Sequence, residues 1–120
     1  MLLKVRKSKD SGNVRIPGSK SHTIRALFFA SLAEGKSEIQ SPLISDDALS
    51  AVEVCRALGA KIEKEDDKYV VEGFGGNPEV PEDVINVGNS GTTLRFGIMT
   101  AALGDECSVF TGDRQIRQRP

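Results

Sequence analysis

The sequence predicts an α/β fold, with helices and short strands alternating along one domain or part of one. Three segments space their apolar residues as the buried side of a helix requires. Short runs of strand-forming residues separate these segments. Two of the helices are entered through a glycine- and serine-rich segment and are followed by a glycine and a strand, so we expect the second to open another copy of the same unit.

The first helix is predicted over residues 20–34, after two short extended segments at 2–5 and 13–16. Its apolar residues fall on one stripe, which one side of a helix can bury, and Gly35 provides a C-terminal stop. A strand is expected to follow at 36–40, where apolar and polar residues alternate.

Ser45 is expected to cap a second helix over 46–58, because Asp46 and Asp47 in its first turn suit the positive end of the helix dipole. Gly59 ends this helix. Its predicted buried stripe consists of Ala48, Val52, Cys55 and Leu58. A hairpin is expected next, with strands at 60–65 and 69–72.

The third helix is predicted over 90–103, between short strands at 84–87 and 106–111. It is apolar on most sides, and a helix of this kind is expected to be buried. Cys55 and Cys107 each lie in an apolar pattern, so both are predicted to be small buried side chains in a reducing compartment.

Composition narrows the possible functions. With 16 basic and 17 acidic residues, a formal net charge of -1 and no tryptophan, the chain is not expected to bind nucleic acid. No cysteine or histidine spacing indicates a metal site, and no cofactor is expected. No apolar stretch is long enough to cross a bilayer, so we expect a cytoplasmic protein without a membrane partner.

The start of the first helix is a candidate anion site. Gly18, Ser19, Lys20 and Ser21 precede or open the helix, and Arg25 follows Ser21 by one turn on the same face. Free backbone N–H groups with nearby cations suit phosphate. The segment differs from a nucleotide P-loop, which needs four residues between Gly and Gly-Lys. An ordinary helix cap with a solvated lysine is the alternative interpretation.

Two further segments are candidate anion sites. Residues 88–93 form a second glycine-flanked helix start, where glycine permits close approach of a ligand to the backbone. Arg114, Arg117 and Arg119 form a basic cluster at the end of the sequence. The alternatives are a flexible capped loop and a solvated basic tail. His22 is interpreted as a bystander.

Five motifs in order resemble the 3-phosphoshikimate 1-carboxyvinyltransferase (EPSP synthase) family. They are Pro-Gly-Ser-Lys-Ser at 17–21, Arg-Ala-Leu at 25–27, Ser-Asp-Asp at 45–47, Gly-Asn-Ser-Gly-Thr at 88–92 and Arg-Gln-Arg-Pro at 117–120. The resemblance implies βαβαββ units stacked as an inverse α/β barrel, with helices inside and sheets outside. One complete unit would occupy about 14–87, followed by part of a second.

The resemblance also implies an activity, the transfer of the enolpyruvyl group of phosphoenolpyruvate to the 5-hydroxyl of shikimate 3-phosphate, with release of phosphate and no metal. Lys20 would contact phosphoenolpyruvate as the candidate catalytic residue, while Ser21 and Arg25 would hold shikimate 3-phosphate. Gly91 and Arg119 would bind phosphoenolpyruvate. The residues implied to shape the glycine loop are Asn89 and Thr92.

Members of the family are two-domain proteins much longer than this chain. By resemblance, residues 1–13 would be a first strand and crossover belonging to the other domain, and 14–120 a partial N-terminal domain. The chain is therefore expected to be a fragment that lacks its C-terminal remainder. It is expected to be inactive alone, because the acid and base carboxylates lie outside it.

Three other interpretations remain open. A UDP-N-acetylglucosamine enolpyruvyl transferase would usually carry Lys-Asn where this chain has Lys20-Ser21, and a reactive loop cysteine for which Cys107, in an expected strand, is a poor candidate. The chain could instead be a complete anion-binding module without catalysis. It could also be an inert fragment that binds nothing measurably.

Overall fold

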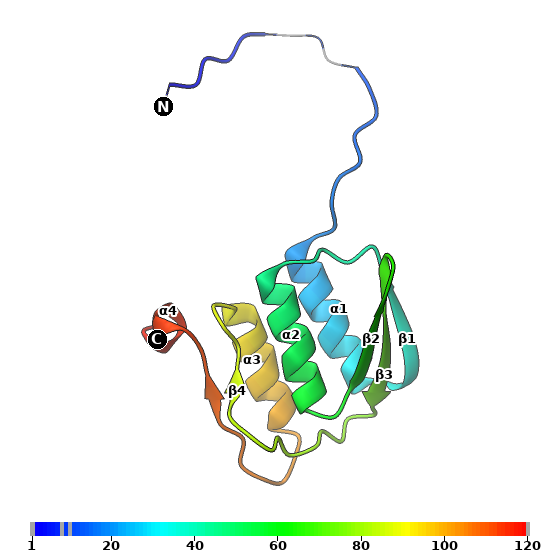
Figure 1. Ribbon diagram of the computed structural model, residues 1–120, viewed down its shortest axis with the longest axis vertical. Coiled ribbons are helices and arrows are strands. Elements are labelled where there is room, and N and C mark those ends of the chain that lie inside the picture. The colour runs from blue at the N-terminus through cyan, green and yellow to red at the C-terminus, as the bar shows by residue number, and fades with distance from the viewer. Residues whose placement is uncertain (1, 8, 10, 120) are drawn as a thin grey trace.

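The computed structural model describes residues 2–7, 9 and 11–119, which form an extended N-terminal arm and a folded body (Figure 1). The elements, in chain order, are α1 Lys20–Leu32, β1 Glu34–Gln40, α2 Asp46–Ala57, β2 Lys61–Glu65, β3 Lys68–Phe74, β4 Ile85–Asn86, α3 Gly91–Ala101, β5 Phe110–Thr111 and α4 Arg114–Arg117. The predicted α/β class is confirmed.

Helices α1, α2 and α3 pack side by side and run in the same direction, with the three-stranded sheet on one side of them (Figure 1). This sheet has the antiparallel order β1-β3-β2. On the other side, β4 and β5 pair in parallel, with α3 as the crossover between them. The β4-α3-β5 arrangement fits the predicted opening of a second unit.

Serine caps fix where the three long helices begin. The hydroxyl of Ser19 accepts from the backbone N–H of His22, that of Ser45 from Ala48, and that of Ser90 from Thr93. Each cap satisfies a backbone donor that the helix itself leaves free. The predicted starts of the first two helices are therefore confirmed, and the third helix begins at Gly91, one residue after its predicted start.

One predicted stop is wrong. Helix α1 ends at Leu32, and Gly35 lies inside β1, where it pairs with Gly73. Gly35 has a φ of +78°, a conformation that glycine adopts without a steric penalty. Gly59, in contrast, follows α2 as predicted, with a φ of +102° and its N–H bonded to the carbonyl of Arg56.

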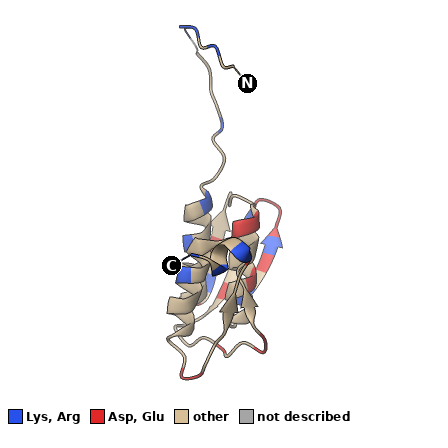
Figure 2. Cartoon of the chain, turned by 90° about the vertical axis from the view of Figure 1, so that its left-hand side faces the viewer, with Lys and Arg blue, Asp and Glu red and all other residues tan. Residues whose placement is uncertain are grey.

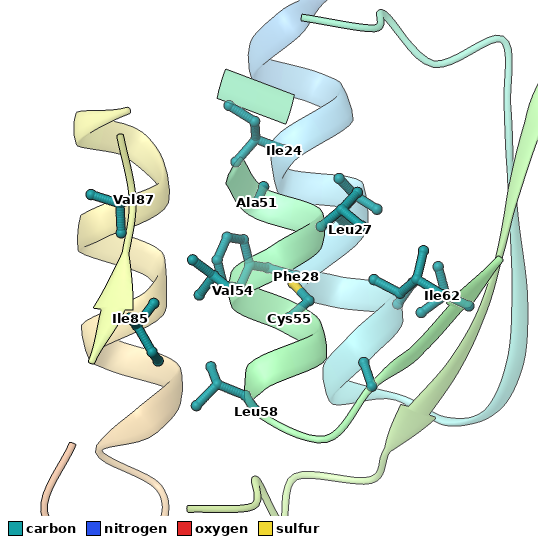
Figure 3. Close-up of a cluster of buried hydrophobic side chains, with 14 of the residues drawn as sticks. Ile24, Leu27, Phe28, Ala51, Val54, Cys55, Leu58, Ile62, Ile85 and Val87 are labelled. Atoms are coloured by element: carbon teal, nitrogen blue, oxygen red, sulfur yellow. The ribbon is translucent and has the colours of Figure 1, made fainter. Parts of the chain in front are cut away.

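The core lies between the helices and the three-stranded sheet and continues on the other side of the helices to Ile85 and Val87 at β4 (Figure 3). The predicted stripe of α2 is buried in full, and α1 contributes Ile24, Leu27 and Phe28. The ring of Phe28 stacks on that of Phe96 at 5.5 Å between centroids, which joins α1 to α3. Burying a side chain of this size stabilises the fold by roughly 1.5–3 kcal/mol.

The prediction that α3 is buried on most sides is wrong. Ile98 is 47% exposed and Met99 70% exposed, and Leu103 just after the helix is also exposed. Helices α1 and α2 cover one side of α3, and Phe110 of β5 lies against Gly97, but the face that carries Ile98 and Met99 stays exposed within the described part of the chain. An apolar sequence pattern indicates that a helix face favours burial, but the face is buried only where another element packs against it.

Three segments that were predicted as strands are irregular in the structure, wholly or in part. Residues 2–5 and 13–16 form no strand, and their apolar side chains are exposed. Residues 106–109 precede β5 as irregular chain, so Cys107 is exposed rather than buried. A strand needs a neighbour for its backbone N–H and C=O groups. Residues 2–5 and 13–16 pair with no strand in the described part of the chain, whereas residues 106–109 meet β4 at Val109, whose carbonyl accepts from the N–H of Ile85 at 2.9 Å.

Helix α4 is an element that the sequence interpretation missed. Asp113 caps it by accepting from the N–H of Ile116, at 2.8 Å from that nitrogen, and the side chain of Ile116 is buried. The basic cluster is thus anchored to the body by an apolar side chain, although Arg114 and Arg117 remain exposed.

Candidate anion-binding site

The helices α1, α2 and α3 begin at the same end of the folded body (Figure 1). The starts of α1 and α3 are two of the three predicted anion sites, the third being the basic cluster at the end of the sequence. A helix start presents backbone N–H groups without intrahelical partners and the positive end of the helix dipole. The folded chain therefore gathers three such starts at one end, which could attract more than one anionic group.

At the start of α1, Lys20 is the first helical residue, and its ammonium nitrogen lies 2.7 Å from Oδ2 of Asp47. The side chain of Lys20 is 49% exposed and that of Asp47 is 25% exposed. Lys20 is therefore accessible to a ligand while it pairs with the first turn of α2.

Ser21 and Arg25 lie one turn apart on α1, as predicted. Nε of Arg25 donates to the backbone carbonyl of Ser21, with 3.0 Å between nitrogen and oxygen. Arg25 is exposed, and no carboxylate among the described residues forms an ion pair with it. Its guanidinium is thus available for an anion at this end of the molecule. His22 is exposed beside it.

At the start of α3, the loop before the helix is held from both sides. Gly88 has a φ of +57°, its N–H donates to the side chain of Asn86, and its carbonyl accepts from the N–H of Asp113 at 2.8 Å. The side-chain amide of Asn89 donates to Gln115 at 3.2 Å. The loop is therefore fastened to α4 and is not a free flexible segment.

Gly91 admits two guanidinium groups to this helix start. A Cβ added at Gly91 would lie 2.9 Å from Nη1 of Arg119 and 3.1 Å from Nη1 of Arg95. Nη1 of Arg95 also donates to the carbonyl of Gly91 at 3.3 Å. The two cations converge on the residue whose lack of a side chain leaves them room.

These three residues line one pocket of about 270 Å³ together with Leu94, Ile98 and Ile116. Apolar walls around cations reduce the competition of water for a bound anion. Thr92, in the first turn of α3, is partly buried and lies outside this lining. Pro120 of the basic motif lies outside the described residues.

Arg95 is a candidate residue that the sequence interpretation missed. A usable signal was present, because Arg95 follows Gly91 by four residues just as Arg25 follows Ser21. Applied to the second glycine-rich helix start, the spacing rule that selected Arg25 would have selected Arg95 as well.

The predicted site residues fall into two groups. Gly91 and Arg119 share a pocket, whereas Lys20, Ser21 and Arg25 do not line it. Asp47 of α2 connects the start of α1 to that of α3, because its side chain accepts from Lys20 and its backbone carbonyl accepts from the hydroxyl of Thr93. Figure 2 shows that basic and acidic residues are interspersed over the body and that Lys and Arg recur along the N-terminal arm.

The two cysteines differ in reactivity. Burial raises the pKa of the Cys55 thiol to about 12, and a hydrogen bond with Ser31 opposes this rise only in part. Cys55 is therefore not a nucleophile at neutral pH. Cys107 is exposed and lies outside any strand. The expected strand was the reason for regarding Cys107 as a poor candidate for a reactive loop cysteine, and the structure removes that reason.

Within residues 2–7, 9 and 11–119, no group of three or more His, Cys, Asp or Glu residues is arranged to hold a metal ion. In the same part of the chain, every helix is too short or too polar to span a bilayer.

Residues 5–120 match the family model described as EPSP synthase (3-phosphoshikimate 1-carboxyvinyltransferase). The chain is 98% identical over 120 residues to the 3-phosphoshikimate 1-carboxyvinyltransferase of Acetivibrio thermocellus, covering 100% of the chain and 28% of that relative. It is 61% identical over 119 residues to the enzyme of the same name from Ruminiclostridium cellulolyticum, covering 99% of the chain and 28% of the relative.

A solved structure shares the fold. The EPSP synthase from Acinetobacter baumannii superposes with a TM-score of 0.84 and 31% sequence identity, covering 91% of this chain and 25% of that one. The chain thus spans less than a third of the length of the relatives it matches.

Proposed function

The chain belongs to the EPSP synthase (3-phosphoshikimate 1-carboxyvinyltransferase) family, and we propose that it is the N-terminal part of an enzyme acting on two anionic substrates. This enzyme transfers the enolpyruvyl group of phosphoenolpyruvate to the 5-hydroxyl of shikimate 3-phosphate. The hydroxyl gives up its proton as its oxygen bonds to C2 of the enolpyruvyl group, the bond from C2 to the phosphate oxygen breaks, and inorganic phosphate leaves with one proton that balances the one lost.

One observation carries the proposal, the convergence of Arg95 and Arg119 on Gly91 at the start of α3. Phosphoenolpyruvate carries a phosphate and a carboxylate, and guanidinium groups bind both in a fixed geometry. Negative charge accumulates on the departing phosphate, so cations already in place stabilise the transition state more than the substrate. The apolar walls of the pocket strengthen that effect.

The start of α1 would bind shikimate 3-phosphate and would also contact phosphoenolpyruvate. In this proposal Ser21 and Arg25 hold the phosphate of shikimate 3-phosphate, and Lys20 reaches phosphoenolpyruvate. The exposure of Arg25 and the accessible ammonium of Lys20 support these roles. Holding two reactants at neighbouring helix starts converts a bimolecular encounter into a positioned one.

The remainder of the relatives' length would supply what this chain lacks. We propose that residues 14–120 are part of an N-terminal domain, and that residues 1–13 belong to the other domain. The described part of this arm supports the assignment, because it forms no strand and its apolar side chains are exposed. The groups that move protons would come from the C-terminal part of the protein.

The experiment is a phosphate-release assay on a full-length protein in which these 120 residues are joined to the remainder of the Acetivibrio thermocellus relative. We expect release that requires both phosphoenolpyruvate and shikimate 3-phosphate. The matched control is the 120-residue chain alone, which we expect to be inactive.

Two results would contradict the proposal. One is a full-length protein that releases no phosphate with this pair of substrates. The other is a protein that turns over when UDP-N-acetylglucosamine replaces shikimate 3-phosphate.

A further inference from the structure

Asp46 and Asp47 are adjacent carboxylates in the first turn of α2, and from sequence both are explained by the helix dipole. In the folded chain their surroundings differ. Asp46 is exposed, and no ion pair among the described residues includes it. Asp47 is mostly buried and lies between the starts of α1 and α3. The helix dipole alone does not explain why Asp47 lies between these two helix starts.

The side chain of Asp47 contacts α1. Its Oδ2 accepts from the ammonium group of Lys20 at 2.7 Å. Because three quarters of the carboxylate side chain is covered, its orientation is restricted, and the lysine that pairs with it is restricted in turn.

The backbone of the same residue contacts α3. The hydroxyl of Thr93 donates to the carbonyl of Asp47 at 3.3 Å. Thr93 is fully buried, and its hydroxyl oxygen lies 2.7 Å from that of Ser90, which caps α3 immediately before Gly91. Asp47 is therefore bonded to both candidate helix starts, to one by its side chain and to the other by its main chain.

We propose that Asp47 is a positioning residue of the reaction proposed above. It holds the ammonium group of Lys20 in place and fixes the distance between that group and the glycine loop. This inference rests on the proposed function for its substrate. A lysine has four rotatable bonds, so a lysine that is already held loses less conformational entropy when it binds an anion.

The proposal predicts a direction of effect. A carboxylate beside a lysine also competes with an incoming anion for it. If competition were the main effect, removing the carboxylate would strengthen binding of phosphoenolpyruvate. If positioning is the main effect, the same change weakens it.

The experiment compares Asp47→Asn with Asp46→Asn in the full-length protein described above. Both variants remove one negative charge from the same turn of α2, so effects on net charge and helix dipole are matched. We expect Asp47→Asn to raise KM for phosphoenolpyruvate about tenfold, equivalent to about 1.4 kcal/mol. We expect Asp46→Asn to leave it within about twofold, and KM for shikimate 3-phosphate to change less in both.

A second pair of variants tests the connection to α3. Thr93→Val keeps the shape of the side chain and removes the hydroxyl, whereas Thr93→Ser keeps the hydroxyl. We expect KM for phosphoenolpyruvate to rise in the valine variant and to return toward the unmodified value in the serine variant. An unchanged or lowered KM in Asp47→Asn would overturn the proposal.

A measurement without substrates separates this inference from the proposed function. The acylation rate of Lys20 by an amine-directed reagent is followed by mass spectrometry in the unmodified protein and in both aspartate variants. We expect faster modification in Asp47→Asn only, because the ammonium group is then no longer held. Equal rates in all three proteins would refute the positioning role, whether or not the protein is a transferase.

Discussion

The start of α1 and the start of α3 use the same local parts in different ways. Each is capped by a serine, and each has an arginine that donates to a backbone carbonyl four residues earlier. At α1 the first helical residue is Lys20, which carries the cation itself. At α3 the first helical residue is Gly91, which has no side chain and therefore leaves room for Arg95 and Arg119.

This difference separates two ways of building an anion site. A site whose cation is part of the helix start stays open to solvent, as the half-exposed Lys20 shows, although Asp47 of α2 holds its ammonium group. A site whose first helical residue is a glycine depends on side chains from distant parts of the chain. At the α3 start, Arg119 and Ile116 of the C-terminal segment provide part of the pocket lining.

The largest expected effect comes from removing the distant cation of the α3 start. We expect Arg119→Ala to lower kcat/KM for phosphoenolpyruvate in the full-length protein about 100-fold, because a charge-assisted hydrogen bond is worth about 1.5–3 kcal/mol. The matched control is Arg117→Ala, since Arg117 is an exposed arginine of α4 outside the pocket lining. Equal losses in the two variants would mean that net charge, and not the pocket, matters.

The next effect compares the two serine caps. The two cap bonds are similar in length, 3.3 Å at Ser90 and 3.4 Å at Ser19, but Ser90 is 1% exposed and its hydroxyl also lies 2.7 Å from that of Thr93, whereas Ser19 is exposed. We expect Ser90→Ala to lower the free energy of unfolding by about 2 kcal/mol and Ser19→Ala by about 0.5 kcal/mol. Urea unfolding of the chain measures both, and equal losses would show that burial of the cap is irrelevant.

A smaller effect is expected from filling the space above Gly91. Gly91→Ala places a methyl group 2.9 Å from Nη1 of Arg119, and the flexible arginine can move away, so the fold is retained while the anion site is distorted. We expect KM for phosphoenolpyruvate to rise about tenfold with little change in unfolding free energy. Gly104→Ala is the control, because an added Cβ there meets no atom closer than 3.4 Å.

The smallest expected effect is the pH dependence of stability caused by Cys55, a buried residue of α2. The pKa of Cys55 rises from 9.0 to about 12 on folding, because burial disfavours the thiolate. Above pH 9 the unfolded chain therefore holds fewer protons than the folded chain, and stability falls as the pH rises toward 12.

We expect this thiol to lower the unfolding free energy by about 1 kcal/mol between pH 8 and pH 10. Urea unfolding at the two pH values measures the loss. In Cys55→Ala the loss should be smaller by that amount, whereas replacing the exposed Cys107 should leave it unchanged. An undiminished loss in Cys55→Ala would show that other groups cause it.

The helix starts could be predicted because the signals that fix them are local. Ser19, Ser45 and Ser90 each bond to an N–H three residues later, and such contacts form whatever the rest of the chain does. The buried stripe of α2 was equally readable, since helical spacing alone places its members on one side.

Apart from the helix stop expected at Gly35, the predictions that failed depended on a partner surface. Residues 2–5 and 13–16 have strand-like composition, but the part of the chain that the structure describes offers no neighbouring strand to them. The outer face of α3 is apolar yet exposed for the same reason. Composition states which surfaces favour burial, and only the presence of a second surface produces it.

The sequence by itself determined where the helices begin, which side of α2 is buried, and the ordered motifs of the family. Only the tertiary structure decided which charges meet. Lys20 and Asp47 are 27 residues apart in the chain and 2.7 Å apart in space, and Arg119 reaches Gly91 from beyond β5. Capping bonds and helical periodicity act over three or four residues and can be read directly, whereas long-range pairings exist only once packing of the core has brought the elements together.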